Sequence, residues 1–509
     1  MPLALPLILW PLVGFCLYVA IIATWYTLFS PLRVIPGPKS WTFFPILRHI
    51  SAILGRFDTD MRRFHAQYGP VVRFGPKEVS FITADAWKAI YGHGHTQLPK
   101  YMHSAADPQS IISTNDTDHS RYRRALSHAF SAKGLQEQEP LIQSYVDKLI
   151  VRLKGVAESG RPEDMVKWFN LTTFDIIGDL AFGEPFGGLD SAEYHHWVST
   201  IFQSIKVNPF ILLKDNYPML GWLLFRAFVP ENLRQAKKRQ IEHSRVTVQK
   251  RLSSNTHTRP DFMDSMLRSR RYTYNQNDWE KAPDALTDSE IVSNSNILII
   301  AGSETTATLL SGVTYWILRS PRVLSRVVCE VRSIMKSEAD ITIQKVSTEL
   351  PYLLACFDEA FRLYPPVPTG LQRRTLAPTL ISGYEFPPGT IVSVHQSGAY
   401  RSESNFHLPN NFIPERWLPD AKNNPSSPFY HDNRAVVQPF SVGPRNCIGR
   451  NLAFAEMRVI LARVLWNFDL ELCKESENWG DQKSKLWAQP SLGTDEAHPS
   501  ALTLGMLKE

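Results

Sequence analysis

A single cysteine stands in a segment whose other residues favour a tight turn followed by a helix. The segment is FSVGPRNCIG, residues 440–449, and Cys447 in it comes just before the helical pattern NLAFAEMRVILARVLW. Backbone N–H groups at a helix N-terminus stabilise negative charge, and we therefore expect a lowered pKa for the Cys447 thiol. A thiolate in such a position acts as a nucleophile or as a metal ligand.

The residues around this thiol favour the metal ligand over the nucleophile. A nucleophile would need a histidine base against the sulfur, and the sequence does not exclude His395, His407 or His431, although none lies in a protease-like context. An axial thiolate on haem iron needs N–H donors and an apolar cover, which explains more of the segment. We expect Phe440 to supply the cover and Arg445 to bind a haem propionate; a buried structural cysteine is the remaining alternative.

The most apolar helical pattern of the globular part is interrupted by a run of polar side chains. Thr287-Asp-Ser-Glu290 matches a capping box, which predicts that a long helix begins there and ends before Pro321. The run AGSETT, residues 301–306, lies inside this helix, where helix propensity gives no reason for an acid and adjacent hydroxyls. Gly302 removes bulk, which would let the helix pass close to a flat ligand. The alternative is a polar kink satisfied by local backbone bonds.

Two further motifs complete a recognisable set. EAFR at 359–362 puts a carboxylate and a guanidinium on one helix face, which alone is a common solvated pair, and PERW follows at 414–417. Along the chain the four motifs come in the order AGSETT, EAFR, PERW and FSVGPRNCIG. Their order and spacing resemble the cytochrome P450 family over essentially the whole chain. The resemblance implies a mainly α fold with a small β region, a haem b cofactor, and Cys447 as the axial ligand of the haem iron.

The resemblance assigns roles to residues in the long apolar helix. Ala301 and Gly302 would lie against the haem, Thr305 would face dioxygen, and Glu304 would belong to the proton-delivery route. The chemistry requires such groups, because oxygen activation consumes protons and misplaced water would release peroxide unproductively. A hydroxyl beside a carboxylate meets this need.

The resemblance also implies a buried ionic network. In the family's pattern Glu359 and Arg362 are joined by the arginine of the PERW motif, here Arg416. A bidentate network of this kind is rigid, and loss of one partner costs ~3–5 kcal/mol. Its expected role is to hold the fold around the haem.

Further haem contacts are expected from basic residues outside the signature. His119 and Arg123 fit the spacing of a propionate-binding pair on one helix, although the family more often has tryptophan at the first position. Arg373 lies where another propionate arginine is expected, but the adjacent Arg374 leaves the register open. Surface salt bridges are the alternative for all three.

Other phrases indicate a branch and a reaction. RALSHAFSAKGL and FNLTTFDIIGDLAFGEPFGGL are similar to fungal secondary-metabolism enzymes of the trichothecene (isotrichodermin) hydroxylase type. This implies oxidation of a lipophilic terpenoid, polyketide or alkaloid intermediate by O₂ with electrons from NADPH. A GxGxxG motif is absent, so we expect separate redox partners, NADPH-cytochrome P450 reductase and cytochrome b5. The alternatives are a haem-thiolate isomerase or dehydratase that does not consume O₂, and a non-catalytic haem-binding membrane sensor.

The N-terminus predicts a membrane anchor. No charged side chain precedes Arg33, and the apolar run is long enough for a helix that needs ~20 residues to span a bilayer. A cleaved signal peptide is the alternative, but no cleavage site is evident. Arg33 and Lys39 follow the run and place the catalytic domain on the cytosolic side of the endoplasmic reticulum membrane. We expect an anchor over residues 1–32, a stiff Pro-rich hinge over 33–40, and a haem domain over 41–509.

Composition and periodicity are consistent with these assignments. The net charge of +6 comes from 55 basic and 49 acidic side chains without a dense basic block, which gives nucleic-acid binding little support. The five cysteines show no disulfide or zinc spacing, which favours a reducing compartment. Residues 60–350 are mostly helical in pattern, with a surface loop over 272–284. Short strands and turns follow Pro365 before a last helix from about Gly449 to Trp466.

Overall fold

A computed structural model of the 509-residue chain describes residues 4–101, 107–205, 207–253, 261–267, 285–481 and 503–507. They form two compact units, each built from separate stretches of the chain. Unit 1 comprises Met1–Met102, Pro368–Pro409 and Asn433–Arg445, and unit 2 comprises His103–Val367, Asn410–Asp432 and Asn446–Glu509. The loop expected over residues 272–284 lies outside the described residues, and the expected division at residues 32 and 40 stays a prediction.

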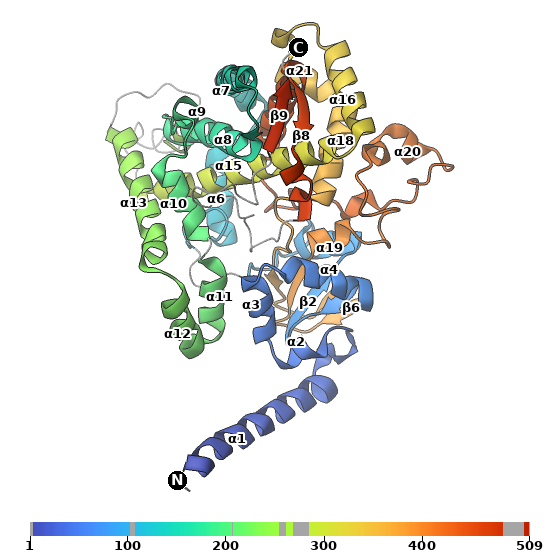
Figure 1. Ribbon diagram of the computed structural model, residues 1–509. Helices are drawn as coiled ribbons and strands as arrows, with labels where there is room; N and C mark the ends of the chain where they lie inside the picture. The colour runs from blue at the N-terminus through green and yellow to red at the C-terminus, as the bar shows by residue number, and fades with distance from the viewer. Residues whose placement is uncertain are drawn as a thin grey trace. The chain divides into compact units, whose positions relative to one another are not determined.

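Unit 1 combines short helices with a small mixed sheet (Figure 1). The strand order is β1-β2-β7-β4, in which β2 and β7 pair in parallel with Val79 opposite Val392, and the other two pairs are antiparallel. The helices are α1 (Ala4–Thr24), α2 (Lys39–Phe43), α3 (Ile46–Ile53), α4 (Phe57–Tyr68), α5 (Ala84–Tyr91) and α19 (Gln396–Tyr400). The strands are β1 (Val71–Arg73), β2 (Glu78–Phe81), β4 (Arg373–Arg374), β7 (Ile391–Val394) and the hairpin β5 (Thr379–Ile381) and β6 (Tyr384–Phe386).

The Pro-rich segment after the apolar run is held against strand β1. The backbone N–H of Arg73 donates to the carbonyl of Pro36 at 2.8 Å. A Cβ atom at Gly37 would lie 1.9 Å from the carbonyl oxygen of Arg73, so only glycine fits there without a shift of the backbone. The stiffness expected from the two prolines is therefore reinforced by direct packing on the sheet.

Unit 2 is predominantly helical and carries one small sheet, β3-β9-β8. Its longer helices are α6 (Asp116–Leu126), α7 (Ala132–Ser159), α8 (Met165–Phe182), α10 (His196–Ile205), α11 (Asn208–Asn216), α12 (Pro218–Phe228), α13 (Glu231–Ser253), α15 (Asp288–Leu318), α16 (Pro321–Ile334), α18 (Pro351–Leu363) and α21 (Arg450–Asn467). The shorter elements are α9 (Gly188–Ser191), α17 (Ile343–Thr348), α20 (Pro419–Asn423), β3 (Glu163–Asp164), β8 (Asp469–Leu472) and β9 (Thr503–Leu507).

Helix α15 is the central element of unit 2 and packs against α8, α18 and α21 (Figure 1). It begins at the predicted capping box, in which Thr287 and Glu290 bond to each other's backbone N–H. A Cβ atom at Gly302 would lie 2.7 Å from Cδ1 of Ile177 in α8. The side chain of Ile177 would have to shift to admit a larger residue, so Gly302 also favours close packing of α15 against α8. The expected room for a flat ligand stays a prediction.

The sequence patterns located most of these elements. The helical pattern expected over residues 60–350 is confirmed by α4, α6, α7 and α8, which include most of MRRFHAQYG, SRYRRALSHAF, LIQSYVDKLIVRLKGVA and WFNLTTFDIIGDLAFG. The short strands β1 and β2 interrupt it at PVVRFG and EVSFIT. Among the described helices, α15 is long and apolar enough to cross a membrane by length and composition, yet most of it is buried inside unit 2. It is therefore a core helix.

Candidate active site

Cys447 lies in the turn that leads into α21, whose N-cap is Gly449. The side chain is solvent-accessible, yet the surrounding protein is dense enough that burial raises the pKa of the thiol. The backbone N–H of Gly449 and the charges of Arg123 and Arg450 act in the opposite direction. The expected lowering of the Cys447 pKa was therefore wrong, because desolvation outweighs the helix terminus.

The surroundings of the sulfur favour a metal ligand over a nucleophile. None of the interactions that shift the pKa of Cys447 comes from a histidine, and His395 instead accepts the N–H of Gly398 within unit 1. A bound metal cation would supply the positive charge that deprotonates the thiol. No base is then needed.

The donor set of unit 2 fits a haem. Within the described ranges, no group of three or more His, Cys, Asp and Glu side chains could hold a metal ion. Haem iron takes its equatorial ligands from the porphyrin, and its axial ligand could be the accessible thiol of Cys447. In α15, which packs with α21, the exposed Ala301 and the half-buried Gly302 and Thr305 give a surface of small side chains that suits a planar ring.

Arg123 is brought directly to the cysteine segment. Its guanidinium donates to the carbonyl of Asn446 at 2.7 Å and to Oδ1 of Asn446 at 2.6 Å. Burial lowers the pKa of Arg123, and the neighbouring Cys447 raises it. His119 is buried one turn earlier on α6. The propionate-binding role expected for His119 and Arg123 stays a prediction. The contact between Arg123 and Asn446 was not predicted, although the place of Asn446 beside Cys447 in the signature was a signal.

Three of the expected haem contacts belong to unit 1. Arg373 is buried in β4 with its guanidinium 5.2 Å from the ring centre of Tyr91, whereas Arg374 is exposed. This settles which of the two arginines points inward. Phe440 and Arg445 are both half-buried in the last stretch of unit 1. The expected roles of Phe440 as apolar cover of the thiolate and of Arg445 as a propionate-binding residue stay predictions.

The polar residues of α15 face different surroundings. The hydroxyl of Thr305 donates to the carbonyl of Ala301 at 2.7 Å. This is the kind of local backbone bond expected if the polar run only forms a kink in the helix. Glu304 is buried, its Oε2 has no hydrogen-bond partner among the described residues, and burial raises the pKa of Glu304 to about 8. Glu304 is therefore a neutral acid at pH 7, able to donate a proton.

The expected ionic network is present and completely buried. Arg362 binds both carboxylate oxygens of Glu359 at 2.7 and 2.8 Å, and Nε of Arg416 donates to the same carboxylate at 3.0 Å. Although burial raises the pKa of Glu359, the two guanidinium groups lower it below its usual value. Two members were missed: Trp417, whose Nε1 donates to Glu359 at 2.9 Å, and Asp432, which binds Arg416. Only Trp417 had a signal, its place in PERW.

Comparison with known proteins identifies the family. The sequence matches the cytochrome P450 family model over residues 35–494. It is 55% identical over 479 residues to the cytochrome P450 monooxygenase olcB of Penicillium canescens, covering 94% of this chain and 95% of that protein. It is 54% identical over 472 residues to the trichothecene C-4 hydroxylase of Trichoderma arundinaceum, covering 92% of each. It is 41% identical to the monooxygenase dtxS2 of Metarhizium robertsii, covering 94% and 92%.

The chain therefore belongs to the cytochrome P450 family. It is a monooxygenase similar to those of fungal secondary metabolism, as the resemblance implied. The mainly helical fold with small sheets and the haem-thiolate cofactor follow from this membership.

Proposed function

We propose that the protein is a membrane-anchored haem-thiolate monooxygenase that hydroxylates or otherwise oxidises a lipophilic intermediate of fungal secondary metabolism. The observation that carries the proposal is the setting of Cys447. The thiol is accessible, receives the N–H of Gly449, and lies beside a segment bound by Arg123, while the described part of the chain offers no further metal-ligand cluster.

The residues of unit 2 divide the work around this cofactor. When bound, the haem supplies activation of dioxygen. Cys447 would hold the iron, Gly449 and Arg123 would stabilise the thiolate charge, and Ala301 would leave room for the ring. Thr305 keeps lone pairs free to accept a hydrogen bond, and the neutral Glu304 holds a proton one residue away.

The substrate class is inferred from the anchor and the relatives. A lipophilic terpenoid, polyketide or alkaloid would partition into the membrane to which the enzyme is attached. One relative is named a trichothecene C-4 hydroxylase, which favours hydroxylation among the oxidations open to this chemistry.

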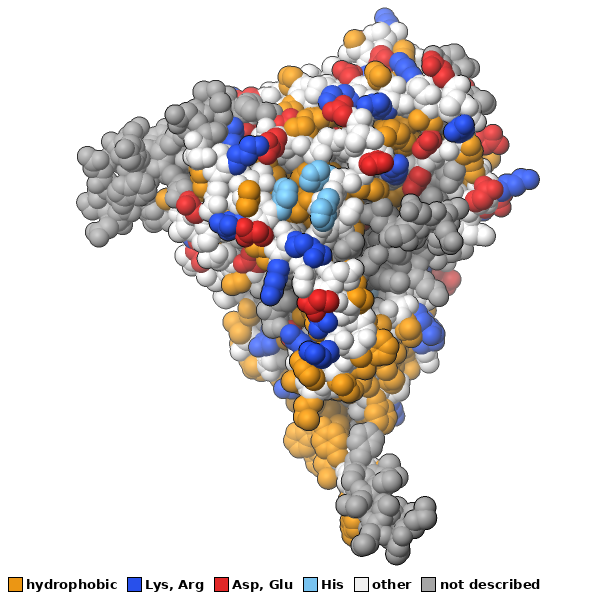
Figure 2. Space-filling view, turned by 60° about the vertical axis from the view of Figure 1, so that its left-hand side comes forward, with side chains coloured by type: hydrophobic (Ala, Val, Ile, Leu, Met, Phe, Trp, Pro, Cys, Tyr) orange, Lys and Arg blue, Asp and Glu red, His pale blue; other side chains and the backbone are white. Residues whose placement is uncertain are grey.

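The anchor would be α1. This 21-residue helix contains no acidic or basic side chain. Most of its described large side chains are exposed, with Trp10 at 74%, Tyr18 at 61% and Ile21 at 67%. Figure 2 shows its described surface as almost entirely hydrophobic, in orange near the lower end of the view. Such a surface is costly in water and suits a bilayer. The catalytic domain would then face the cytosol at the endoplasmic reticulum.

Electrons would come from NADPH through a reductase, with cytochrome b5 as a second donor. A basic group on unit 2 suits an acidic partner: Lys422 and Arg450 are exposed, Arg458 is half-buried, and all three act on the carboxyl of Asp358. Arg450 also acts on Cys447, so this group lies near the thiolate.

We expect Lys422→Glu to slow electron transfer from the reductase in stopped-flow measurements, most at low ionic strength. Equal rates at all salt concentrations would place docking elsewhere.

The decisive experiment has two parts. The purified, dithionite-reduced protein should show the red-shifted carbon-monoxide absorbance band of thiolate-ligated haem, and Cys447→Ala should lose it. Expressed with a reductase in a host that lacks related enzymes, the protein should add one oxygen atom to terpenoid, polyketide or alkaloid intermediates. A product that contains no atom from O₂ would favour the isomerase or dehydratase, and stable haem without NADPH-dependent turnover would favour the sensor.

A further inference from the structure

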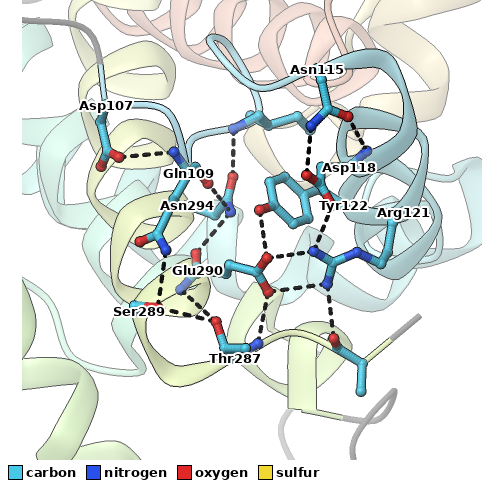
Figure 3. Close-up of polar contacts among 12 residues, drawn as sticks. Asp107, Gln109, Asn115, Asp118, Arg121, Tyr122, Thr287, Ser289, Glu290 and Asn294 are labelled. Atoms are coloured by element: carbon cyan, nitrogen blue, oxygen red, sulfur yellow. Dashed lines mark hydrogen bonds and ion pairs between the residues drawn. The ribbon is translucent and has the colours of Figure 1, made fainter. Parts of the chain in front are cut away.

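A buried carboxylate joins the start of α15 to the middle of α6. Glu290, in the first turn of α15, accepts hydrogen bonds from both terminal nitrogens of Arg121 and from the hydroxyl of Tyr122 at 2.8 Å. The backbone N–H of Thr287 also donates to it at 2.8 Å. Figure 3 shows the Glu290 side chain at the centre of these contacts, with Arg121 and Tyr122 pointing toward it from α6. Helix capping alone uses only the bond from Thr287.

The contacts with Arg121, Tyr122 and Thr287 favour the ionised form of Glu290. The side chain is largely buried, and although burial raises the pKa of Glu290, the bonds from Arg121, Thr287 and Tyr122 lower it to about 2. The same contact raises the pKa of Arg121. The pair is therefore charged throughout the physiological pH range. A bidentate guanidinium–carboxylate contact fixes orientation as well as distance.

A second set of bonds prevents this end of α15 from moving separately. Asn294, one turn later, donates to the carbonyls of Glu290 at 2.8 Å and Gln109 at 3.2 Å, and its Oδ1 accepts the N–H of Ile111 at 2.8 Å. The hydroxyl of Ser293 donates to Asp107 at 2.7 Å. The chain that leads into α6 is therefore bound to the turn of α15 that follows the one bound to α6 itself (Figure 3).

Both helices carry residues of the candidate site. Arg123 follows Arg121 and Tyr122 directly, and its guanidinium binds Asn446 beside Cys447. The Glu290 contact holds one side of α6, and the Arg123 contact holds the cysteine segment to the other. A rotation of α6 would therefore move Arg123 away from Asn446.

We propose that Glu290 is a positioning residue, which holds α6 in the orientation that keeps Arg123 on the Cys447 segment. Glu290 acts through Arg121 and Tyr122 and itself touches neither cofactor nor substrate. The proposal rests on the proposed function, in that it takes Cys447 as the iron ligand.

The test compares Glu290→Gln with Thr287→Ala in the full-length, haem-loaded protein. Glutamine keeps the size of the side chain and can still cap the helix, but it loses the charge that holds Arg121. Thr287→Ala removes the hydroxyl cap of the same turn and leaves the contact with α6 in place. Hydrogen exchange of the amides of residues 116–126 and the carbon-monoxide difference spectrum are recorded for each variant.

For Glu290→Gln we expect about tenfold faster exchange across α6, and a loss of the red-shifted band at lower urea concentration than in the wild type, while the helical circular dichroism is retained. Thr287→Ala should leave both the hydrogen exchange of α6 and the urea dependence of the red-shifted band unchanged. If Glu290→Gln does not accumulate as folded protein, Arg121→Gln takes its place, since Arg121 is only half-buried and its replacement should be tolerated. It removes the other half of the same contact and should have the effects expected for Glu290→Gln.

The outcomes separate the two proposals. If the wild-type protein lacks the red-shifted band, the proposed function fails. If the wild type shows the band, and the Glu290 or Arg121 variant keeps both the wild-type exchange of α6 and the wild-type urea dependence of the band, the positioning role is overturned. Equal effects of Thr287→Ala and Glu290→Gln would overturn it as well, since helix capping would then explain both.

Discussion

Thr305 and Thr306 are adjacent in α15 and carry the same hydroxyl, but they face different surroundings. Thr305 is half-buried and Thr306 is 3% exposed, and each donates to the carbonyl four residues earlier. We expect Thr305→Ala to lower the product formed per NADPH consumed by about tenfold, because a positioned proton-transfer group contributes at least this much. Thr306→Val is the matched control and should leave this ratio near that of the wild type. Equal ratios for Thr305→Ala and the wild type would remove Thr305 from proton delivery.

Glu304 makes the stability of the protein depend on pH. The pKa of its carboxyl rises from 4.5 to about 8 on burial, so between these values the folded state holds a proton that the unfolded state releases. Its contribution to the free energy of unfolding should therefore fall by about 1.4 kcal/mol per pH unit as the pH rises through this window. Glu304→Gln stays neutral and should be more stable than the wild type at pH 8 and similar at pH 4.5. Denaturant unfolding at both pH values measures the difference, and parallel pH dependences would show that Glu304 is already ionised.

From local patterns, the residue chemistry was predictable only where it depends on neighbours along the chain, and the Glu359–Arg416 contact across 57 positions was expected from the family resemblance. The position of Cys447 before a helix and the capping box at Thr287 follow from local sequence. The direction of the Cys447 pKa shift does not, because it depends on the protein packed around the sulfur. Asp432 binds Arg416 across 16 positions in the sequence, a contact for which no local pattern exists.

At the scale of elements, the Glu359 network links α18 to the segment of Pro414–Trp417. Arg416→Ala would leave the Glu359 and Asp432 carboxylates short of a buried partner, and we expect a loss of ~3–5 kcal/mol in the free energy of unfolding. The control is Arg322→Ala, which breaks an exposed pair with Glu415 and should cost at most about 1 kcal/mol. Urea unfolding with haem absorbance as the probe compares the two. Similar losses would mean that burial does not set the strength of these pairs.

Helix periodicity predicted the elements better than the reasons for individual residues within them. The start of α15 followed from the capping box, and its end before Pro321 followed from the proline. The contact of Gly302 with α8 could not be derived, because the nearest atom to a Cβ there is Cδ1 of Ile177 in another helix. Such contacts join residues that are more than 100 positions apart. Single-sequence patterns contain no information about them.

For the whole molecule, deletion of residues 2–24 should release the protein from membranes and leave haem binding intact, as expected for a single anchor. The deletion retains Ser30, whose Oγ accepts a hydrogen bond from the Arg73 guanidinium in unit 1. Sedimentation of membranes with spectroscopic haem quantification measures both properties. Retention in the membrane pellet would point to a second contact, for which the exposed Met219 (90%) and Phe228 (67%) of α12 are candidates.

The division into two interleaved units was not foreseen from the sequence. The expected bounds of the haem domain, 41–509, stay a prediction, and unit 1 draws on three stretches of the chain. The assignment depends on contacts between distant segments, which composition does not encode.

The parallel pairing of β2 with β7 has a consequence for synthesis. Strand β2 ends at Phe81 and its partner begins at Ile391, so β2 leaves the ribosome roughly 300 residues before β7 is made. At a translation rate of about 5–20 residues per second, this strand waits some 15–60 s with an open edge. A nascent chain in this state is a substrate for chaperones, and the yield of folded enzyme in a foreign host should respond to their supply more than to codon choice in the later segments.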